Sequence, residues 1–311
     1  MTITPERRAQ PDARSLSARS LSWGHAYAMV SPDHFRVDYS INPFMDPADQ
    51  PDAALARAQW DELLVTLLTC GASVDVLRQR EDAPDMVYAM NLGLAATVAG
   101  RRRMVMSHMR FPERRTEGLT ARPHFDAAGF DTTEVGRDGI GAYFESGDAF
   151  PFGDALLVGF GKRTDEQGLK ALACELDVRV RGLRIVHPAM YHLDLAFCPL
   201  DERRAMVCPD ALDEASAAAL LALVPESLVI TEDEALTFCA NSVVIGRTVV
   251  MPGCPQRIRA QLEAWGFEIV LVDVGEFHKG GGSIRCMTNP TDIVVGRDLP
   301  EVPGGEVLLA G

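Results

Sequence analysis

The strongest constraint on how this chain can fold is a unit that recurs five times along its 311 residues. Each unit has a helical stretch, then a strand, then a pair of strands joined by a short turn. The helical stretches cover 48–68, 113–128, 166–176, 214–223 and 256–265. The strands after them cover 73–77, 130–135, 183–187, 227–231 and 267–272, and a first strand covers 25–30. The strand pairs are 86–97 with 103–107, 142–150 with 155–159, 191–198 with 204–208, 236–245 with 249–251, and 284–287 with 293–296. The sequence therefore predicts an α/β fold with pseudo-fivefold repeats.

Polar residues open the strand pairs in register with this repeat. Along the chain they are Asn91, then Glu145 with Asp148, then His192 with Asp194, then Asn241, and finally Cys286. The steps between the leading residues of each group are 54, 47, 49 and 45 residues. Because radial repetition of a small β unit brings equivalent ends to one axis, we expect these side chains to converge at a single central site.

A glycine-rich stretch precedes the last of these residues. Gly280, Gly281 and Gly282 remove side chains at a point where the backbone must bend sharply or approach another group closely. One thiol, Cys286, follows. A lone cysteine beside a glycine turn is more often a packed core residue, but its register with a histidine and several carboxylates favours a chemical role.

Composition and charge limit the classes of binding partner and the cellular location that we expect. The formal net charge of −14 argues against nucleic acid and anionic membranes as partners, because both require a basic surface. No apolar run approaches the roughly 20 residues that cross a bilayer. The seven cysteines are scattered without a C-x-x-C pair, which favours reduced thiols in a cytoplasmic protein. We expect no metal site and no cofactor.

The domain organisation is also predicted from the composition of successive parts of the sequence. Residues 1–22 are rich in arginine and serine and are expected to form a disordered arm. Residues 23–303 are expected to form a single catalytic domain, and residues 304–311 a C-terminal tail. A homodimer is the default expectation for the assembly.

Six segments together resemble the guanidino-modifying enzymes, which include arginine deiminases, dimethylarginine dimethylaminohydrolases, arginine and succinylarginine dihydrolases, and amidinotransferases. The segments are INPFM (41–45), PDMVYAMN (84–91), FESGD (144–148), GKRT (161–164), HLD (192–194) and GGGSIRCMT (280–288). Each is weak evidence alone, but their order and phase with the repeat are specific. The resemblance implies a five-bladed α/β propeller with its active site in a central channel.

The chemistry of a guanidino group assigns roles to three of these residues. The guanidinium carbon is a poor electrophile, so an enzyme must hold the cation with carboxylates, attack it with a strong nucleophile and protonate the leaving amine. Cys286 is the predicted nucleophile, which would form a covalent amidino-thioether. His192 is the predicted general acid and then general base, and Glu145 is predicted to orient it.

Seven further residues are predicted to bind the substrate. Asp194 lies two residues from His192 and is expected on the same side of one strand, where it can hold the guanidinium. Arg110 and Arg163 occupy positions where the resembling enzymes use arginines for a substrate carboxylate. Arg114 and Arg115 are interpreted as a solvated charge run. The complete predicted binding set is Asn91, Asp194, Asp148, Arg110, Arg163, Asn42 and Asn241.

Asn91 departs from the aspartate that arginine deiminases and dimethylarginine dimethylaminohydrolases carry at this position. An amide can donate a hydrogen bond to the oxygen of a ureido product, whereas a carboxylate only accepts. The dihydrolase branches also carry asparagine here. The sequence therefore predicts an arginine dihydrolase-type hydrolase that converts arginine to ornithine, ammonia and carbon dioxide.

Three alternatives remain open. A deiminase or dimethylarginine dimethylaminohydrolase would stop at citrulline, and an amidinotransferase would use the same Cys286–His192 pair with an amine acceptor. A ribosome-binding factor of the same fold would lack this chemistry altogether. The lid over the site is predicted in the loop 31–47 or the segment 111–121.

Overall fold

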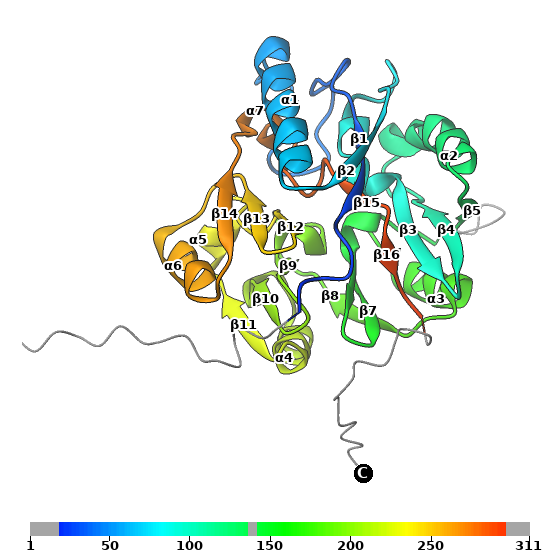
Figure 1. Ribbon diagram of the computed structural model, residues 1–311. Coiled ribbons are helices and arrows are strands. Elements are labelled where there is room, and N and C mark those ends of the chain that lie inside the picture. The colour runs from blue at the N-terminus through cyan, green and yellow to red at the C-terminus, as the bar shows by residue number, and fades with distance from the viewer. Residues whose placement is uncertain (1–18, 136–141, 297–311) are drawn as a thin grey trace, which may run out of the picture.

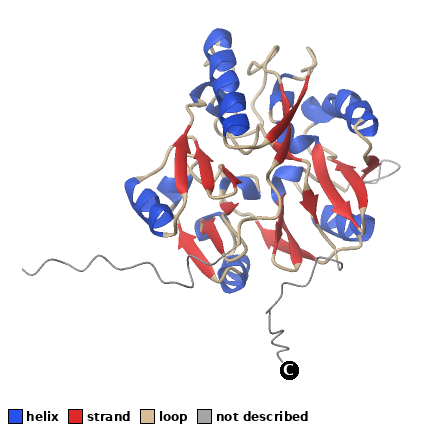
Figure 2. Cartoon of the chain, in the orientation of Figure 1, coloured by secondary structure: helices blue, strands red, loops and turns tan. Residues whose placement is uncertain are grey.

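Five small sheets follow one another around the middle of the molecule, and the long helices lie outside them (Figures 1 and 2). The computed structural model describes residues 19–135 and 142–296. The predicted mixed α/β class is confirmed. The predicted arm at 1–22 falls on described residues only from 19 onward, and the predicted tail at 304–311 lies outside the described residues.

All five sheets share one strand pattern, in which a middle strand pairs antiparallel with one neighbour and parallel with the other. The middle strands are β1 (Ala26–Val30), β4 (Arg101–Met106), β7 (Ala155–Phe160), β10 (Arg204–Val207) and β13 (Thr248–Met251). Their antiparallel partners are β15 (Asn289–Pro290), β3 (Gly93–Val98), β6 (Ala149–Phe152), β9 (Phe197–Pro199) and β12 (Val243–Ile245). Their parallel partners are β2 (Ser73–Leu77), β5 (Asp131–Glu134), β8 (Val180–Arg184), β11 (Glu226–Val229) and β14 (Glu268–Leu271).

A helix connects each middle strand to its parallel partner, because parallel strands cannot be joined by a tight turn. These helices are α1 (Ala53–Thr69), α2 (Gly118–Ala127), α3 (Glu166–Leu176), α4 (Glu214–Leu223) and α6 (Gln256–Ala264). Aspartate N-caps start three of them: Asp52, Asp165 and Asp213 each accept a hydrogen bond from a backbone N–H of the first turn. The predicted bounds of α3 and α4 are confirmed.

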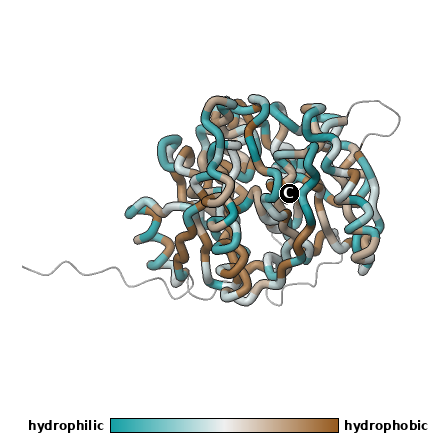
Figure 3. Tube along the Cα trace, turned by 90° about the horizontal axis from the view of Figure 1, so that it is seen from above, coloured by the Kyte–Doolittle hydropathy of each residue, from teal (hydrophilic) through white to brown (hydrophobic). Residues whose placement is uncertain are grey.

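Apolar side chains from the strands and the inner faces of the helices fill the space between them. Seen from above, apolar and polar stretches alternate around the molecule, as expected when every unit buries its own strands (Figure 3). Two short helices, α5 (Glu232–Ala235) and α7 (Gly275–His278), lie in connecting segments. Of the helices that the structure describes, none is long and apolar enough to cross a membrane.

The predicted last strand pair is wrong. Residues 284–287 form a turn, in which the Met287 N–H bonds to the Ser283 carbonyl and the Thr288 N–H bonds to the Arg285 carbonyl. These backbone N–H groups are bonded within the turn, so they cannot donate to a neighbouring strand. The residues that follow split between two sheets: β15 completes the sheet of β1, and β16 (Ile293–Val294) pairs in parallel with β3.

Three predicted strands also begin later than expected. The segments 86–92, 146–148 and 193–195 contain short 3₁₀ helices, so β3, β6 and β9 start after the polar residues rather than with them. Asp194 therefore does not share a strand with His192, because the Leu195 N–H bonds to the His192 carbonyl at 3.2 Å and bends the chain. Likewise, residues 236–245 contain a strand only at β12.

Glycine 168 brings α3 against the segment that carries Glu145. A Cβ at position 168 would lie 2.1 Å from the backbone oxygen of Tyr143, two residues before Glu145. At Gly118, in the first turn of α2, a Cβ would meet nothing closer than 3.9 Å. Gly168 is therefore required for a close approach between backbones, whereas Gly118 has room for a side chain.

We predict that Gly168→Ala lowers the free energy of unfolding by about 3 kcal/mol, because the clash is with backbone and the helix must shift. Gly118→Ala should leave it unchanged or raise it by about 0.5–1 kcal/mol, since alanine is the better helix former. Urea denaturation of both variants checks this. Equal effects at the two positions would contradict the close approach at Gly168.

Candidate active site

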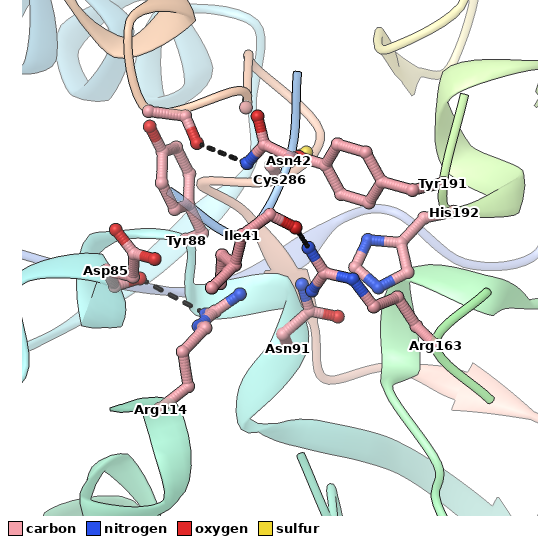
Figure 4. Close-up of a pocket in the computed structure, with 12 residues that line it drawn as sticks. Ile41, Asn42, Asp85, Tyr88, Asn91, Arg114, Arg163, Tyr191, His192 and Cys286 are labelled. Atoms are coloured by element: carbon pink, nitrogen blue, oxygen red, sulfur yellow. Dashed lines mark hydrogen bonds between the residues drawn. The ribbon is translucent and has the colours of Figure 1, made fainter. Parts of the chain in front are cut away.

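A narrow pocket lies where the turns at the strand entries meet (Figure 4). Asn91, His192 and Cys286 line it, together with Asn42 and Arg163. These residues come from units far apart in the sequence, as the register of the repeat predicts. The free volume of about 10 Å³ is room for about one water molecule.

The carboxylate of Glu145 holds His192 in place. Its Oε2 lies 2.8 Å from His192 Nε2 and accepts a hydrogen bond from Arg163 Nη1 at 3.0 Å. Its Oε1 accepts from the backbone N–H of Arg110 at 3.0 Å. Burial alone would raise the pKa of Glu145, but Arg163 and His192 outweigh it and hold the pKa below its usual range. With Nε2 committed to this carboxylate, Nδ1 is the imidazole nitrogen left for a reacting group.

Cys286 sits in the turn 284–287, with its thiol between an amide and a carboxylate. Asn241 accepts from the Cys286 backbone N–H at 3.1 Å and donates through Nδ2 to Sγ at 3.2 Å. The thiol donates to Asp194 Oδ2 at 3.4 Å. Burial, followed by the charge of Asp194, raises the pKa of the Cys286 thiol well above its usual value. The raised pKa keeps the thiol protonated at neutral pH.

Two tyrosines fix the glycine-rich stretch in front of this turn. The Tyr88 hydroxyl donates to the Phe277 carbonyl at 2.6 Å, and the Tyr191 hydroxyl donates to the Gly281 carbonyl at 2.5 Å. A Cβ at Gly280 or Gly282 would lie 2.1 or 2.4 Å from atoms of the Tyr88 side chain. Glycine is thus required here because the backbone approaches the Tyr88 ring closely. Close approach and a sharp bend are the two reasons for glycine at these positions that the sequence suggests.

Asn91, Asp194 and His192 converge on Gly147. A Cβ at Gly147 would lie 3.1 Å from Asn91 Oδ1, and 3.2 Å from both Asp194 Oδ2 and His192 Nδ1. The Gly147 N–H donates to Asn91 Oδ1 at 2.8 Å, which leaves the Asn91 NH2 group for the pocket. Asp194 Oδ1 is buried and has no hydrogen-bond partner among the described residues.

Four of the predicted substrate-binding residues lie outside the pocket lining: Asp148, Asp194, Asn241 and Arg110. Both oxygens of Asp148 accept from backbone N–H groups, those of Leu193 at 3.0 Å and Thr164 at 3.3 Å. Burial raises the pKa of Asp148 to about 7. The Arg110 side chain is exposed and lies over the Tyr143 ring, 5.4 Å from its centroid. Asp148 fastens neighbouring segments, and Arg110 contacts the site through its backbone.

The interpretation of Arg114 as a solvated charge is wrong. Its side chain is 4% exposed, lines the pocket, and donates to Glu117 at 2.7 and 3.0 Å and to the Asp85 carbonyl at 3.2 Å (Figure 4). The sequence signal was the opposite charge three residues later, which a helical turn brings alongside.

Asp85, opposite Arg114 in the pocket, was also missed. Its carboxylate is buried, its Oδ1 has no hydrogen-bond partner within the described ranges, and burial raises its pKa. Burial also raises the pKa of Glu117, to about 7. Among residues 19–135 and 142–296, no cluster of three or more His, Cys, Asp or Glu side chains is arranged to hold a metal ion.

The fold and this site agree with the relationships of the chain. A family model described as "N,N dimethylarginine dimethylhydrolase, eukaryotic" matches residues 31–293. The chain therefore belongs to the dimethylarginine dimethylaminohydrolase family, within the guanidino-modifying enzymes. Like its dimethylarginine dimethylaminohydrolase and arginine dihydrolase relatives, it is a hydrolase of guanidino C–N bonds.

Two curated relatives carry the names of two different reactions. The chain is 38% identical over 264 residues, covering 84% of both chains, to an N(G),N(G)-dimethylarginine dimethylaminohydrolase of Mycobacterium tuberculosis. It is 32% identical over 266 residues to the bifunctional arginine dihydrolase/ornithine cyclodeaminase ArgZ of Synechocystis, covering 84% of this chain and 37% of ArgZ.

Solved structures give the same picture. The N-terminal domain of ArgZ, an arginine dihydrolase bound to its product, matches with a TM-score of 0.81 and 30% identity over 87% of this chain and 98% of that domain. A dimethylarginine dimethylaminohydrolase adduct matches with a TM-score of 0.68 and 19% identity over 85% of this chain and 98% of that one, which shows the fold alone.

The convergence on Gly147 generates a prediction. Gly147→Ala should lower kcat/KM by about 10- to 100-fold, because an added methyl group displaces three buried side chains at once. The thermal midpoint should change by only a few degrees, since the contacts are 3.1–3.2 Å rather than a hard overlap. Steady-state kinetics check this with Gly118→Ala as the matched control. Full activity in Gly147→Ala would show that these side chains need not meet there.

The environment of Cys286 generates another. Alkylation of Cys286 by iodoacetamide in the ligand-free protein should be slow at pH 7 and still rising at pH 9, because a raised pKa keeps the thiol protonated. Millimolar guanidinium ion should accelerate alkylation at pH 7, because a cation beside Asp194 stabilises the thiolate. Mass spectrometry of the modified peptide measures both rates. A plateau below pH 8 without ligand would contradict a neutral resting thiol.

Proposed function

We propose that this enzyme is an arginine dihydrolase-type hydrolase, which converts L-arginine in two successive hydrolyses to ornithine, two ammonia and carbon dioxide. The observation that carries the proposal is the orientation of Asn91. Its oxygen is committed to the Gly147 N–H, and its NH2 group is left for the substrate. The likeness to the ArgZ dihydrolase domain supports the same reaction.

The first hydrolysis uses the guanidinium as its own activator. The cation binds against Asp194, whose Oδ1 has no hydrogen-bond partner in the described part of the chain, and stabilises the Cys286 thiolate. Sulfur attacks the guanidino carbon, and His192 protonates the nitrogen that leaves as ammonia. A water then attacks the amidino-thioether carbon and gives its proton to His192. The thiolate departs and a ureido product, citrulline, remains.

The second hydrolysis repeats the sequence on the ureido carbon. Cys286 adds to this carbon, and ammonia leaves after protonation by His192, which gives a thiocarbamate. Water releases a carbamic acid, which breaks down to the free amine and carbon dioxide. The ureido oxygen carries negative charge as sulfur adds, so the Asn91 NH2 group stabilises it. An aspartate at this position would repel that oxygen instead.

The pocket lining also carries groups suited to the head group of a free amino acid. Arg163 and Arg114 supply donors for a carboxylate there. Asp85 Oδ1 and the Ile41 carbonyl supply acceptors for an ammonium group. Arg163 donates to that carbonyl at 3.0 Å, so an amino acid that binds here would exchange one hydrogen bond for another.

The loop 31–47 is proposed as the lid. Ile41 and Asn42 line the pocket, and Asn42 Nδ2 donates to the Gly280 carbonyl at 3.1 Å. Because the pocket holds about one water molecule, this loop has to move for arginine to enter. A closed five-bladed propeller is part of the same proposal, supported by the common strand pattern and by β15, which completes the sheet of β1.

The second candidate is a dimethylarginine dimethylaminohydrolase that stops at citrulline, favoured by the family model and by the 38% identical mycobacterial relative. It uses the same Cys286–His192 pair. The difference lies in whether the ureido product is attacked again.

Product analysis separates the two. With L-arginine, wild-type enzyme should give ornithine and two ammonia per arginine, and Cys286→Ser should give neither. Asn91→Asp should accumulate citrulline with one ammonia, because it keeps the first step and loses the donor for the second. Turnover of dimethylarginine to citrulline and dimethylamine, with L-arginine unchanged, would establish the second candidate. Citrulline as the sole product from L-arginine would instead make the enzyme a deiminase.

A further inference from the structure

A buried cation lies directly beside the predicted nucleophile and outside the pocket lining. Arg285 is 2% exposed, and its guanidinium lies between the rings of Trp23 and Phe150, 5.1 and 4.9 Å from their centroids. Its Nε and Nη2 are buried and have no hydrogen-bond partner among the described residues. Burying a charge without a direct partner is costly, so packing alone does not account for an arginine here.

The charged and titratable groups that face Arg285 identify what its charge acts on. They are Tyr27 on β1, Asp194 in the 3₁₀ turn before β9, Cys198 on β9, and Cys286 on its own turn. Asp194 is the one carboxylate in that set. Burial favours its neutral form and raises the pKa of Asp194, whereas His192, the Cys286 thiol and Arg285 stabilise its ionised form.

We propose that Arg285 is a positioning residue for the nucleophile, whose charge allows the Asp194 carboxylate and the Cys286 thiolate to be ionised together 3.4 Å apart. The inference rests on the proposed role of Cys286. A residue that does not line the pocket thereby influences the reactivity of the Cys286 thiol.

The charge balance of the reacting complex requires such a group. Attack needs the carboxylate to hold the guanidinium and the sulfur to carry a negative charge, which puts two anions in one buried place. The substrate supplies one cation. Arg163 contacts Glu145, and His192, which also stabilises ionised Asp194, shares that same Glu145 carboxylate, so neither balances the second anion alone. The phenols of Tyr88 and Tyr191, which also face the thiol, are neutral because burial raises their pKa values. Among the described residues that act on Asp194 and the thiol, Arg285 is a cation without a carboxylate contact of its own.

The backbone connects Arg285 to the same amide that holds the thiol. The Arg285 N–H donates to the Asn241 carbonyl at 3.2 Å, and the side chain of Asn241 donates to Cys286 Sγ. This link does not depend on the side chain at position 285. A substitution of that side chain therefore tests charge and leaves the turn in place.

The test measures the pH dependence of Cys286 alkylation by iodoacetamide in Arg285→Met and Arg285→Lys. In Arg285→Met the midpoint should rise by about one unit, with a tenfold slower reaction at neutral pH, since one nearby unit charge has this effect in a partly polar interior. Arg285→Lys should stay within threefold of wild type, because it keeps the charge. Arg285→Met should fold, since replacing an unpartnered buried charge by an apolar side chain of similar length is tolerated.

Arg247→Met provides the matched control. Arg247 also lies over an aromatic ring, 3.7 Å from the Phe267 centroid, and pairs with Asp201 outside the pocket. It should leave the alkylation profile unchanged. An unchanged profile in Arg285→Met, or equal losses in Met and Lys variants, would overturn the proposal. Alkylation does not require turnover, so these results test the role of Arg285 separately from the proposed reaction. Failure of the proposed reaction would show differently, as activity retained in Cys286→Ser.

Discussion

The site depends on one buried carboxylate. Glu145 has no exposed surface, and it is ionised only because Arg163 and His192 both contact it. Removing either partner leaves a buried charge that is poorly balanced, which typically costs about 3–5 kcal/mol. The same carboxylate accepts from the Arg110 backbone, so one group fixes the orientation of a histidine, an arginine and a neighbouring chain segment. Its low pKa means that it stays ionised throughout the neutral range.

Around this carboxylate the site is assembled from turns rather than from regular strands. Asn91, Asp148 and Asp194 lie in 3₁₀ helices that precede the strands, and Cys286 lies in a turn. The strands supply a rigid frame, and the turns supply backbone N–H groups for the polar side chains. This explains why Asp148 is fully buried without contacting the pocket: its two oxygens accept from two of these N–H groups.

The repeat, the fold class and the convergence of the polar residues could be predicted from the sequence, because periodicity and register are properties of the chain itself. The 3₁₀ turns could not, since the apolar pattern of residues 86–97 is as typical of a strand as of a short helix followed by one. Arg114 was misjudged for a different reason. Its neighbours suggest a solvated run, and only the packing of the 3₁₀ helix Pro112–Glu117 against Asp85 buries it. The split of residues 289–294 between two sheets depends on contacts more than 190 residues away, which no local pattern records.

That split has a consequence for how the enzyme is made. During synthesis, β1 leaves the ribosome well before β15, so the first two strands of this sheet wait for their third strand while most of the chain between them is made. Cys286 lies three residues before β15, and its turn is anchored by Asn241, which is also made before it. The thiol is therefore the last of the converging side chains to be synthesised. Its placement and the completion of the β1 sheet belong to the same late stage of synthesis.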